Sequence, residues 1–386
     1  MAHMSTHKND PVVLLLDPRG ISKYNSVTVT KRLDEYAKQL AIQTSENSLG
    51  LVVLSSSKSF KSKKKILKYV KIYYISKPTF NFVFFAIRSF KFIKSSDLEI
   101  KLIIASDPWE SYWCAYFLAK FSRISIPIQI QVHGDFADPR WSSLSIQNRI
   151  RHSLAKLSLP RADSIRAVSK QQTKNLIKNF HLEPTRIQII PVPVLIHLKL
   201  RTSRLNRPRT IGLVGRIHKD RGIWEFIKLI KILNKSSNNF SIIVVGTGPD
   251  RDIFLEKLKL VNPTIKIEYL GQIPNNKMPS VWAKIGVLVS MAPAESYGLA
   301  MREALLHGIP VWATNSSGVN DLNKECRSGE LKIIDLKKEG FSINKDFERL
   351  LKVKVSAAFA KNFTKENNTY ALKLANSWIN TINKAK

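Results

Sequence analysis

The sequence is poor in cysteine, poor in acidic residues and free of long apolar runs. Only Cys114 and Cys326 occur among the 386 residues; this excludes a disulfide scaffold and favours a reducing compartment, and neither has metal-ligand spacing. The most apolar stretch, residues 78–87, is too short to cross a membrane. The apolar run 12–16 ends at Asp17, so we predict no signal peptide.

The shortage of acidic residues leaves a large positive charge. The chain has 62 Lys and Arg against 29 Asp and Glu, a formal net charge of +33. A field of this sign attracts nucleic acid or an anionic lipid surface. The basic composition of a whole proteome is the alternative explanation.

One segment, residues 58–94, concentrates this charge, and no acidic residue occurs between 47 and 96. Its lysines alternate with aromatic residues, which is typical of a peripheral membrane segment. A nucleic-acid surface uses the same residue types, and a solvated basic face with its phenylalanines in the core is a third interpretation. We favour the membrane. The lysines expected to contact it are Lys63, Lys64, Lys65 and Lys68.

The length predicts two domains, since 386 residues exceed one usual core and 44% of them are hydrophobic. Strands alternate with helices, which is typical of doubly wound α/β domains. The expected strands are 12–16, 51–54, 100–105, 128–132, 186–194, 210–214, 241–245, 265–270, 285–291 and 309–313. The predicted organisation is an N-terminal domain at 11–195, a linker at 196–209, a second domain at 210–362 and a final helix at 363–386.

The most informative stretch is 285–313, which predicts a strand, a loop over 292–297, a helix from Gly298 to Gly308, and a strand. In a parallel sheet this loop lies at the carboxyl edge, where ligands of α/β proteins bind. The first N–H groups of the helix lack helical acceptors and attract an anion such as phosphate. These groups belong to Ser296, Tyr297, Gly298 and Leu299.

Two glutamates flank this anion site. Glu295 precedes the helix and Glu303 lies one turn inside it, so both could accept hydrogen bonds from sugar hydroxyls on either side of a phosphate, the layout of a nucleotide sugar. Simpler roles exist for each. Glu295 alone is a solvated loop residue, and Glu303 alone favours the helix dipole or pairs with His307.

The whole motif favours a ligand-binding role for the two glutamates over these simpler roles. Glu295-Ser-Tyr-Gly, Glu303-Ala and His307-Gly-Ile-Pro-Val resemble the signature of the retaining glycosyltransferases of family 4, in which two glutamates separated by seven residues precede Gly-x-Pro-Val. The resemblance implies a GT-B fold: two Rossmann-like, doubly wound domains face each other across a cleft, and the C-terminal helix crosses back to the first domain. It also implies retention of configuration.

A second resemblance follows the strand 210–214. Cations in such a loop can clamp two phosphates, and Gly215-Arg216 resembles the diphosphate site of the family, where an Arg and a Lys do this work. Arg216 matches the Arg. Arg221 occupies the Lys position, unless Lys219 takes that role.

Further positions follow from the resemblance. His133, at the end of strand 128–132, alone would more often be a structural histidine, but the resemblance places it beside the transferred sugar. The backbone of Gly271 and Ile273 would lie near the nucleotide base. The chain departs from the family at 191–194, where Pro-Val-Pro-Val replaces Asn-Gly-Val-Asp, so any contact made there by the family is in doubt.

No metal or other cofactor is predicted. Asp250-Arg-Asp252 has the spacing of the metal-binding aspartates of the other large glycosyltransferase fold. It follows Gly-Pro at a helix start, however, where Asp is a natural cap.

We therefore predict a retaining, metal-independent glycosyltransferase, with Glu295, His133 and Arg216 as catalytic residues. It would move a sugar from a UDP- or GDP-sugar to a lipid-linked or polysaccharide acceptor of the cell envelope, which enters near Gly20. We expect it in the cytoplasm, peripheral on the inner face of the plasma membrane. A nucleotide-sugar epimerase or phosphorylase is the alternative, and a nucleic-acid-binding protein would explain the charge but not the motif.

Overall fold

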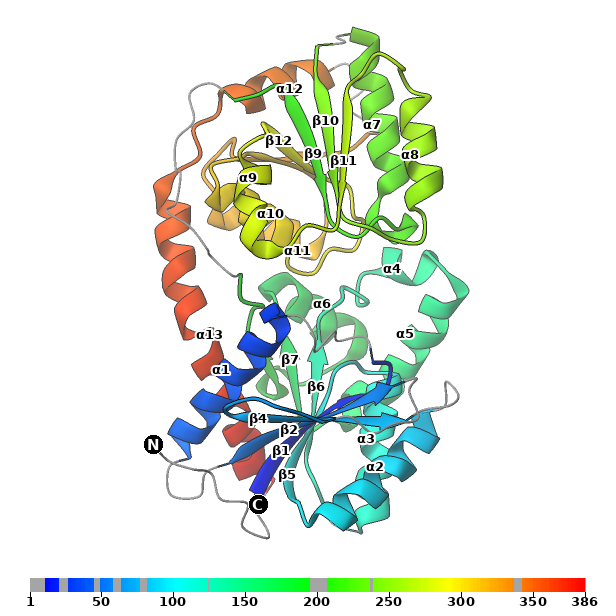
Figure 1. Ribbon diagram of the computed structural model, residues 1–386, viewed down its shortest axis with the longest axis vertical. Helices are drawn as coiled ribbons and strands as arrows, with labels where there is room; N and C mark the ends of the chain where they lie inside the picture. The colour runs from blue at the N-terminus through cyan, green and yellow to red at the C-terminus, as the bar shows by residue number, and fades with distance from the viewer. Residues whose placement is uncertain are drawn as a thin grey trace.

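The chain forms two α/β domains, each built on its own sheet (Figure 1). The computed structural model describes residues 11–20, 27–44, 49–57, 64–76, 82–123, 125–194, 207–236, 239–336 and 342–385. Most of the predicted linker, 195–206, and Lys63 lie outside these residues.

The N-terminal domain contains an eight-stranded sheet in the order β3-β4-β2-β1-β5-β6-β7-β8. All neighbours are parallel except β3 and β4. The strands are β1 (Pro11–Asp17), β2 (Gly50–Ser57), β3 (Lys64–Ile66), β4 (Val70–Ser76), β5 (Glu99–Ala105), β6 (Ile128–Val132), β7 (Ser164–Ala167) and β8 (Ile187–Ile189). The α-helices are α1 (Val27–Gln43), α2 (Phe82–Ser96), α3 (Glu110–Ser122), α4 (Pro139–Ser143), α5 (Ile146–Ser158) and α6 (Lys170–Phe180).

The C-terminal domain contains a six-stranded parallel sheet in the order β11-β10-β9-β12-β13-β14. The strands are β9 (Thr210–Val214), β10 (Ser241–Val245), β11 (Ile267–Gly271), β12 (Val287–Ser290), β13 (Val311–Thr314) and β14 (Leu331–Ile334). The helices are η3 (Lys219–Arg221), α7 (Ile223–Ser236), α8 (Arg251–Lys259), α9 (Met278–Trp282), α10 (Leu299–Leu306), α11 (Ser317–Glu325), α12 (Ile343–Lys352) and α13 (Ala357–Lys384).

Both sheets are covered on two faces, which explains why central strands such as β1 and β10 are almost entirely apolar. In β1, Leu14 and Leu16 pack into one core of the N-terminal domain, whereas Val13 packs into the core on the opposite face. Alternate side chains of a strand point to opposite faces, and a parallel sheet covered by helices buries both. The predicted doubly wound α/β class is therefore confirmed.

Helix α13 joins the two domains, as the expected crossing helix (Figure 1). It begins at Ala357 beside the C-terminal domain and runs down along α1. There Tyr36 of α1 packs edge-on against Tyr370 and Trp378, with ring centroids 5.1 and 6.2 Å apart. The Trp378 indole N–H also donates to Gln129 Oε1 at 3.0 Å. The helix thus buries Tyr370 and Trp378 in the N-terminal domain, whereas Phe359 and Phe363, nearer its start, pack in the core of the C-terminal domain.

The basic segment 58–94 is built differently from the prediction. Its described part is not a separate interfacial segment: β3 and β4 form the edge of the N-terminal sheet, and α2 packs on α3. Phe85 is fully buried in the core, whereas Phe84 is 56% exposed. Most of the aromatic residues in α2 therefore pack inside the domain, and the structure follows the third interpretation more closely than the membrane one.

The predicted strand 186–194 is shorter than expected, because only Ile187–Ile189 pair as β8. Pro191 and Pro193 carry no N–H group for a ladder. The chain beyond β8 instead bonds to side chains: Asn367 of α13 donates to the Val194 carbonyl at 3.0 Å and accepts from its N–H at 2.8 Å.

Candidate active site

The loop between β12 and α10 forms the centre of the site. Gly298 ends this loop in the left-handed region, with φ 78° and ψ 53°. This positive φ strains residues that carry a β-carbon, so the position favours glycine. Helix α10 begins at Leu299, as predicted from the sequence, and Gly308 follows it with φ 73°.

The predicted anion site holds the chain's own carboxylate. Glu295 Oε1 accepts hydrogen bonds from the N–H groups of Tyr297 at 3.3 Å and Gly298 at 3.0 Å. Two of the four N–H groups predicted to face a phosphate are therefore occupied by Glu295. The loop is shaped to bind an anion, but a ligand phosphate would have to replace the carboxylate at these two groups.

Arg221 lies across from this loop. Its Nη1 atom is 2.9 Å from Glu295 Oε2. Gly222 makes this approach possible: its φ is 69°, and an added β-carbon would lie 1.9 Å from the carbonyl oxygen of Met291, just after β12. The two loops therefore touch at the carboxyl edge of the sheet, and glycine is the residue that allows the contact.

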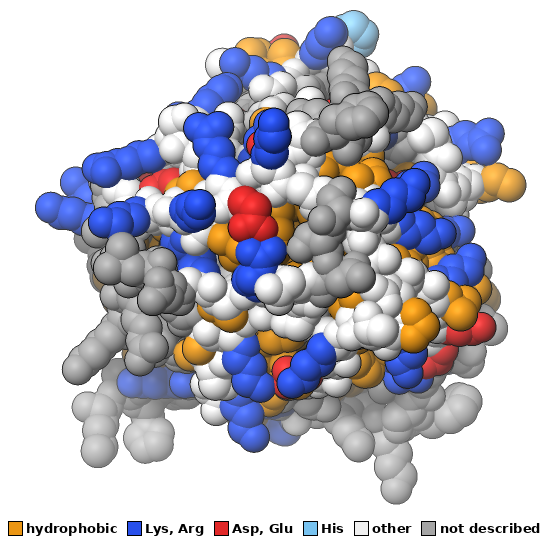
Figure 2. Space-filling view, turned by 90° about the horizontal axis from the view of Figure 1, so that it is seen from above, with side chains coloured by type: hydrophobic (Ala, Val, Ile, Leu, Met, Phe, Trp, Pro, Cys, Tyr) orange, Lys and Arg blue, Asp and Glu red, His pale blue; other side chains and the backbone are white. Residues whose placement is uncertain are grey.

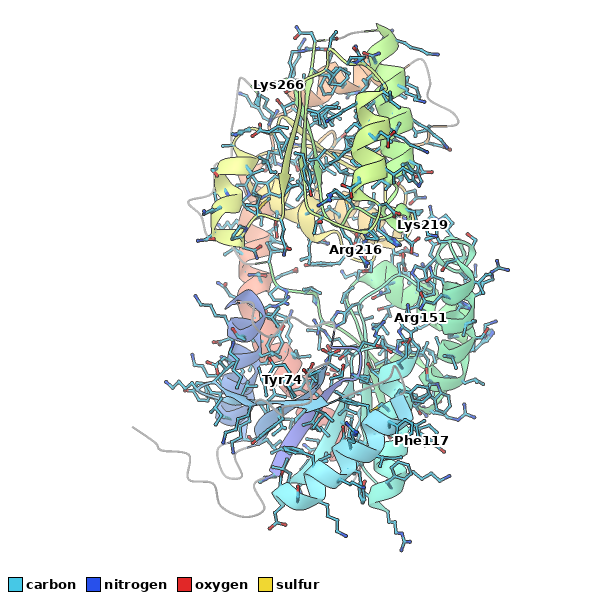
Figure 3. The ribbon with its side chains drawn as sticks, turned by 45° about the vertical axis from the view of Figure 1, so that its right-hand side comes forward. Tyr74, Phe117, Arg151, Arg216, Lys219 and Lys266 are labelled. Carbon is cyan, nitrogen blue, oxygen red and sulfur yellow. The ribbon has the colours of Figure 1, made fainter. Side chains whose placement is uncertain are left out.

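Arg216 is available for a ligand. It is exposed, and in the described part of the chain its guanidinium has no hydrogen-bond or ion-pair partner. Figure 3 shows Arg216 and Lys219 on the side of the C-terminal domain that faces the N-terminal domain. Arg216 and Lys219 lie in the loop after β9, beside the strand that leads to Glu295, and Arg221 is a third cation of this loop that is already paired.

Asp250 does not have the expected capping role. It stands at the start of α8, but its side chain makes no cap hydrogen bond there. Asp250 Oδ2 instead accepts from the N–H of Lys219 at 2.7 Å, and Asp252 pairs with Arg251 at 2.7 Å. Asp250 therefore fixes the loop that carries Arg216 and Lys219.

Glu303 has an unusual environment for a carboxylate. Burial raises its pKa to about 7, so near neutral pH it is protonated about half of the time. The suggested pairing with His307 is absent: the ring Nδ1 of His307 bonds to the backbone carbonyl of Glu303 at 2.7 Å. Glu303 is thus a carboxyl group close to its titration point in the first turns of α10.

His133, from the N-terminal domain, contacts the loop between β12 and α10. Its carbonyl oxygen accepts a hydrogen bond from Ser296 Oγ at 2.6 Å. His133 is an exposed residue that lines a cavity together with Arg32 and Arg166. Desolvation of the ring, followed by the charges of Arg166 and Arg32, lowers its pKa to about 3. Its imidazole is therefore neutral at physiological pH.

Other cross-domain contacts accompany this one. Asp321 Oδ2 accepts from the Gln171 N–H at 2.8 Å, and Asn175 donates to Ser317 Oγ at 2.9 Å. These contacts join α6 and α11, both beside the carboxyl edges of their sheets. The carboxyl edges of the two sheets therefore face each other.

The remaining donor-side residues lie along the same edge. The Gly215 N–H donates to Val245 at 2.9 Å, and the Gly246 N–H donates to Gly271 at 2.7 Å. Ile273 packs against the core cluster that includes residues of α10. The loops after β9, β10 and β11 thus meet beside the loop after β12.

The predicted acceptor residues are not gathered in one place. Gly20 follows β1, and an added β-carbon would lie 2.6 Å from the Ser56 carbonyl at the end of β2. Lys64, Lys65 and Lys68 belong to or follow β3, which is separated from β1 by two strands. The structure thus gives Gly20 and the lysines different surroundings.

Arg302 is a site residue that the sequence reasoning missed. It is only 2% exposed, donates from Nε to the Tyr297 carbonyl at 3.2 Å, and lies over the Tyr297 ring at 4.0 Å. Its Nη atoms form a bidentate pair with Glu325 of α11, of which the Nη2 bond is 3.0 Å. The available signal was an arginine on a short helix whose other residues, apart from Glu303, are apolar.

Positive charge is spread over the surface. Figure 2 shows Lys and Arg side chains distributed over the face seen from the top of Figure 1, with few acidic side chains between them. Within the described residues, no helix combines the length and the apolarity that a membrane crossing requires.

Known sequence families match the chain in two adjoining segments. The one described as Glycosyltransferase Family 4 matches residues 35–195, and Glycosyl transferases group 1 matches residues 200–353. A curated relative, the 2-deoxystreptamine glucosyltransferase of Streptomyces kanamyceticus, is 24% identical over 214 residues, or 51% of this chain and 55% of the relative. The chain thus spans about half the length of that relative.

Solved structures share the whole architecture. Sucrose-phosphate synthase from Thermosynechococcus elongatus superposes with a TM-score of 0.69 at 16% identity, over 95% of this chain and 97% of that chain. Anabaena HepE in complex with UDP and glucose gives 0.64 at 17%, over 94% and 99%. These likenesses show the fold. The two family matches cover most of the chain, which therefore belongs to the family 4 glycosyltransferases and has their GT-B fold.

Proposed function

We propose that the protein transfers a sugar from a nucleotide-diphosphate sugar to a hydroxyl group of its acceptor. One observation carries the proposal. The loop before α10, which binds an anion, lies in the same domain as Arg216, a cation without a partner among the described residues. Glu295 occupies the loop amides and Arg221 neutralises Glu295. Arg216 is exposed in the loop after β9, the strand that pairs with β12 in the same sheet. The diphosphate of a nucleotide sugar would give Arg216 an anionic partner. The sugar hydroxyls would donate hydrogen bonds to the Glu295 carboxylate.

The chemistry requires stabilisation of a leaving group. As the bond between the anomeric carbon and the phosphate breaks, negative charge accumulates on the departing diphosphate. Guanidinium groups at Arg216 and Arg221 and the loop amides would stabilise that charge in a site with little water. The Glu295 carboxylate would give up its hydrogen bonds from the loop amides and accept hydrogen bonds from hydroxyls of the donor sugar instead. The backbone N–H groups of Tyr297 and Gly298 could then bind the phosphate.

The neutral ring of His133 suits a position beside the sugar. An imidazole with a pKa of about 3 adds no positive charge next to a carbon that itself becomes positive. His133 can donate or accept one hydrogen bond to a sugar hydroxyl, and Ser296 ties its backbone to the donor loop. We therefore assign His133 to the orientation of the transferred sugar.

We further propose that transfer proceeds with retention and without a metal ion. Retention is the expectation for the family: the acceptor oxygen would bond to the anomeric carbon on the face from which the diphosphate departs, and the departing diphosphate would take the acceptor proton. In the metal-free proposal, arginines perform the charge neutralisation that a divalent ion performs elsewhere. Full activity after dialysis against EDTA, with no gain on adding Mg²⁺ or Mn²⁺, is the expected result.

The acceptor is proposed to be a lipid-linked or polysaccharide glycan at the inner face of the plasma membrane. Support comes from the net charge of +33 and from basic residues at the exposed edge strand β3. Replacing Lys64, Lys65 and Lys68 with Glu should weaken sedimentation with anionic vesicles but not with neutral ones. Unchanged sedimentation would exclude β3 from the membrane contact.

A donor screen tests the central proposal. Thermal unfolding is followed with UDP, GDP, ADP and their sugars, because a ligand that binds only the folded protein raises its stability. The nucleotide that raises the melting temperature is then tested in a transfer assay, with Arg216→Ala as the control. Donor-only formation of an epimer, or cleavage that depends on phosphate, would instead identify an epimerase or a phosphorylase. Binding of DNA or RNA that survives Glu295→Ala would favour a nucleic-acid protein.

A further inference from the structure

A cavity opens at the carboxyl edge of the N-terminal sheet. It has a volume of about 300 Å³ and is bordered by α1 and by residues from the ends of β1, β5, β6 and β7. This size is at the lower limit of cavities that hold small ligands, enough for one charged group and part of a sugar. Its charged residues are Asp17, Arg19, Arg32 and Arg166.

Arg166 is a buried cation whose hydrogen bonds all go to neutral atoms. It is 2% exposed, and its guanidinium donates to Gln131 Oε1 at 2.6 Å and to the carbonyls of Ile190 at 3.0 Å and Pro191 at 2.9 Å. Considering only the residues that the structure describes, it forms no ion pair. Buried charges are usually paired, so Arg166 lacks the direct counter-charge that such a group usually has.

Arg32 adds a second uncompensated charge. It projects from α1, is partly buried, and also forms no ion pair within the described ranges. Burial is the main cause of the low pKa of His133, and the charges of Arg166 and Arg32 lower it further. Arg32 and Arg166 therefore act on the same side chain. Burial lowers the pKa of Arg166 itself to about 10, and the charge of Arg32 contributes to this. The two guanidinium groups therefore repel each other across the cavity.

The other charged groups on the wall are already engaged. Arg19 Nη2 lies 2.7 Å from Asp107 Oδ2, and Arg19 Nη1 lies 3.9 Å from Glu110. Asp17 accepts from Ser55 Oγ at 3.2 Å. Arg32 and Arg166 are therefore the groups that an anionic ligand would neutralise.

The cavity lies in the N-terminal domain, next to the residue that contacts the loop between β12 and α10. His133 lines it, and the carbonyl of the same residue accepts the hydrogen bond from Ser296 at 2.6 Å. A group bound here therefore lies in the N-terminal domain, directly across the cleft from Glu295. We propose that the acceptor carries an anionic group, a phosphate ester or a carboxylate, which Arg32 and Arg166 bind in this cavity. The inference rests on the proposed transfer reaction and restricts its acceptors to anionic molecules.

Titration calorimetry with defined probes tests the proposal. The soluble probes are glycerol 3-phosphate and glucuronate, with glycerol and glucose as their neutral counterparts, and vesicles that contain a polyprenyl phosphate represent a lipid-borne phosphate. Titrations are run with and without a saturating nucleotide diphosphate, which occupies the donor site. We expect the anionic probes to bind and the neutral ones not to bind, with affinity that falls as salt rises.

The variants Arg32→Gln and Lys31→Gln form a matched pair. Lys31 is exposed on the same helix and is not part of the cavity wall. Arg32→Gln should weaken binding of the anionic probes at least about tenfold, whereas Lys31→Gln should leave it within about twofold. Arg166→Lys, which keeps the charge but not the fork, should weaken binding as well. Equal binding of neutral and anionic probes, or no effect of Arg32→Gln, would overturn the proposal.

The outcomes separate the acceptor site from the donor site. Arg216→Ala should abolish nucleotide binding and leave glycerol 3-phosphate binding unchanged. If wild-type protein binds no nucleotide but binds the anionic probes through Arg32, the transfer proposal fails while the anion site stands. Binding of soluble probes indicates a soluble or exposed anionic glycan, binding of the vesicles alone indicates a lipid phosphate, and no binding of either rejects the site.

Discussion

Arg221 and Glu295 form an ion pair at 2.9 Å although 74 residues separate them in the sequence. The pair joins the first loop of the C-terminal domain to the loop before α10. It lies at the surface, with Arg221 49% and Glu295 20% exposed. Surface pairs of this kind contribute about 0–1 kcal/mol to stability. Its geometry therefore matters more to ligand binding than to folding.

The first prediction separates these two effects. Glu295→Gln and Arg221→Ala should each change the free energy of unfolding by less than about 1 kcal/mol, yet lower kcat/KM about 100-fold or more. Denaturant unfolding and steady-state kinetics on the same preparations measure both. A large loss of stability with nearly normal kcat/KM would show that the pair is structural.

Arg216 supports a second prediction, since it is exposed and has no partner among the described residues. Arg216→Ala should lower kcat/KM by about 100- to 1000-fold, because a charge on the leaving diphosphate is no longer stabilised. Arg216→Lys should recover part of this, as a point charge without the bidentate fork. Lys228→Ala, an exposed cation on α7, is the control and should leave the kinetics unchanged. Equal kinetics of Arg216→Ala and the control would remove Arg216 from the site.

Lys219→Ala then decides which cation is the second ligand of the diphosphate. Arg221 is engaged with Glu295, whereas Lys219 has only its backbone N–H fixed, by Asp250 at 2.7 Å. If Arg221 is the second ligand, as we expect, Lys219→Ala should raise the donor KM less than about threefold. A larger rise for Lys219→Ala than for Arg221→Ala would reverse the assignment.

The stretch 285–313 was the most predictable part of the chain, because its boundaries are set locally. Gly298 and Gly308 both adopt positive φ, 78° and 73°, and such glycines mark a helix start and a helix end in the sequence itself. The strands around them are buried on both faces and read as continuous apolar runs. No distant contact was needed to place these elements.

The basic segment was less predictable, because its aromatic residues fit both a membrane surface and a protein core. Which one applies depends on what packs against α2. The structure supplies α3, with Phe82 and Phe117 stacked at 6.3 Å between ring centroids. Likewise, the bond from Gly298 to the Glu295 carboxylate depends on the loop conformation, which residue types alone do not determine.

Glu303 leads to a prediction about pH. Burial raises its folded-state pKa from 4.5 to about 7, so the folded protein binds this proton more tightly than the unfolded chain. The resulting stabilisation is complete below pH 4.5 and is lost as pH rises through 7. Glu303→Gln stays neutral at every pH. It should match wild type near pH 4.5 and be more stable by about 1–3 kcal/mol at pH 8.

The same variant should bind nucleotide less well. If the Glu303 carboxylate accepts ribose hydroxyls, wild-type affinity should rise between pH 6 and pH 8 as the group ionises. The affinity of Glu303→Gln should be about tenfold lower at pH 8 and should not show this rise. Thermal unfolding at both pH values, with and without nucleotide, measures stability and affinity together. Parallel pH profiles for the two proteins would show that Glu303 does not titrate in this range.

The last prediction concerns Arg302 and Glu325, whose two ends differ in burial. The Arg302 side chain is 2% exposed and that of Glu325 is 41% exposed. Removing the arginine leaves a carboxylate that water can solvate, so Arg302→Met should cost about 1–3 kcal/mol, mainly from the lost bond to the Tyr297 carbonyl. Removing the carboxylate leaves a buried guanidinium without its counter-charge. Glu325→Gln should therefore be the more damaging change, at about 3–5 kcal/mol.

Denaturant unfolding of the two single variants measures this asymmetry directly. Because Arg302 holds the Tyr297 carbonyl and ring from behind the loop, Arg302→Met should also raise the donor KM several-fold while kcat changes less. A merely structural role would lower stability and leave the KM of the remaining folded enzyme unchanged. If Arg302→Met proves the more destabilising of the two, packing of the arginine against Tyr297 and Phe363, rather than its charge, dominates at this position.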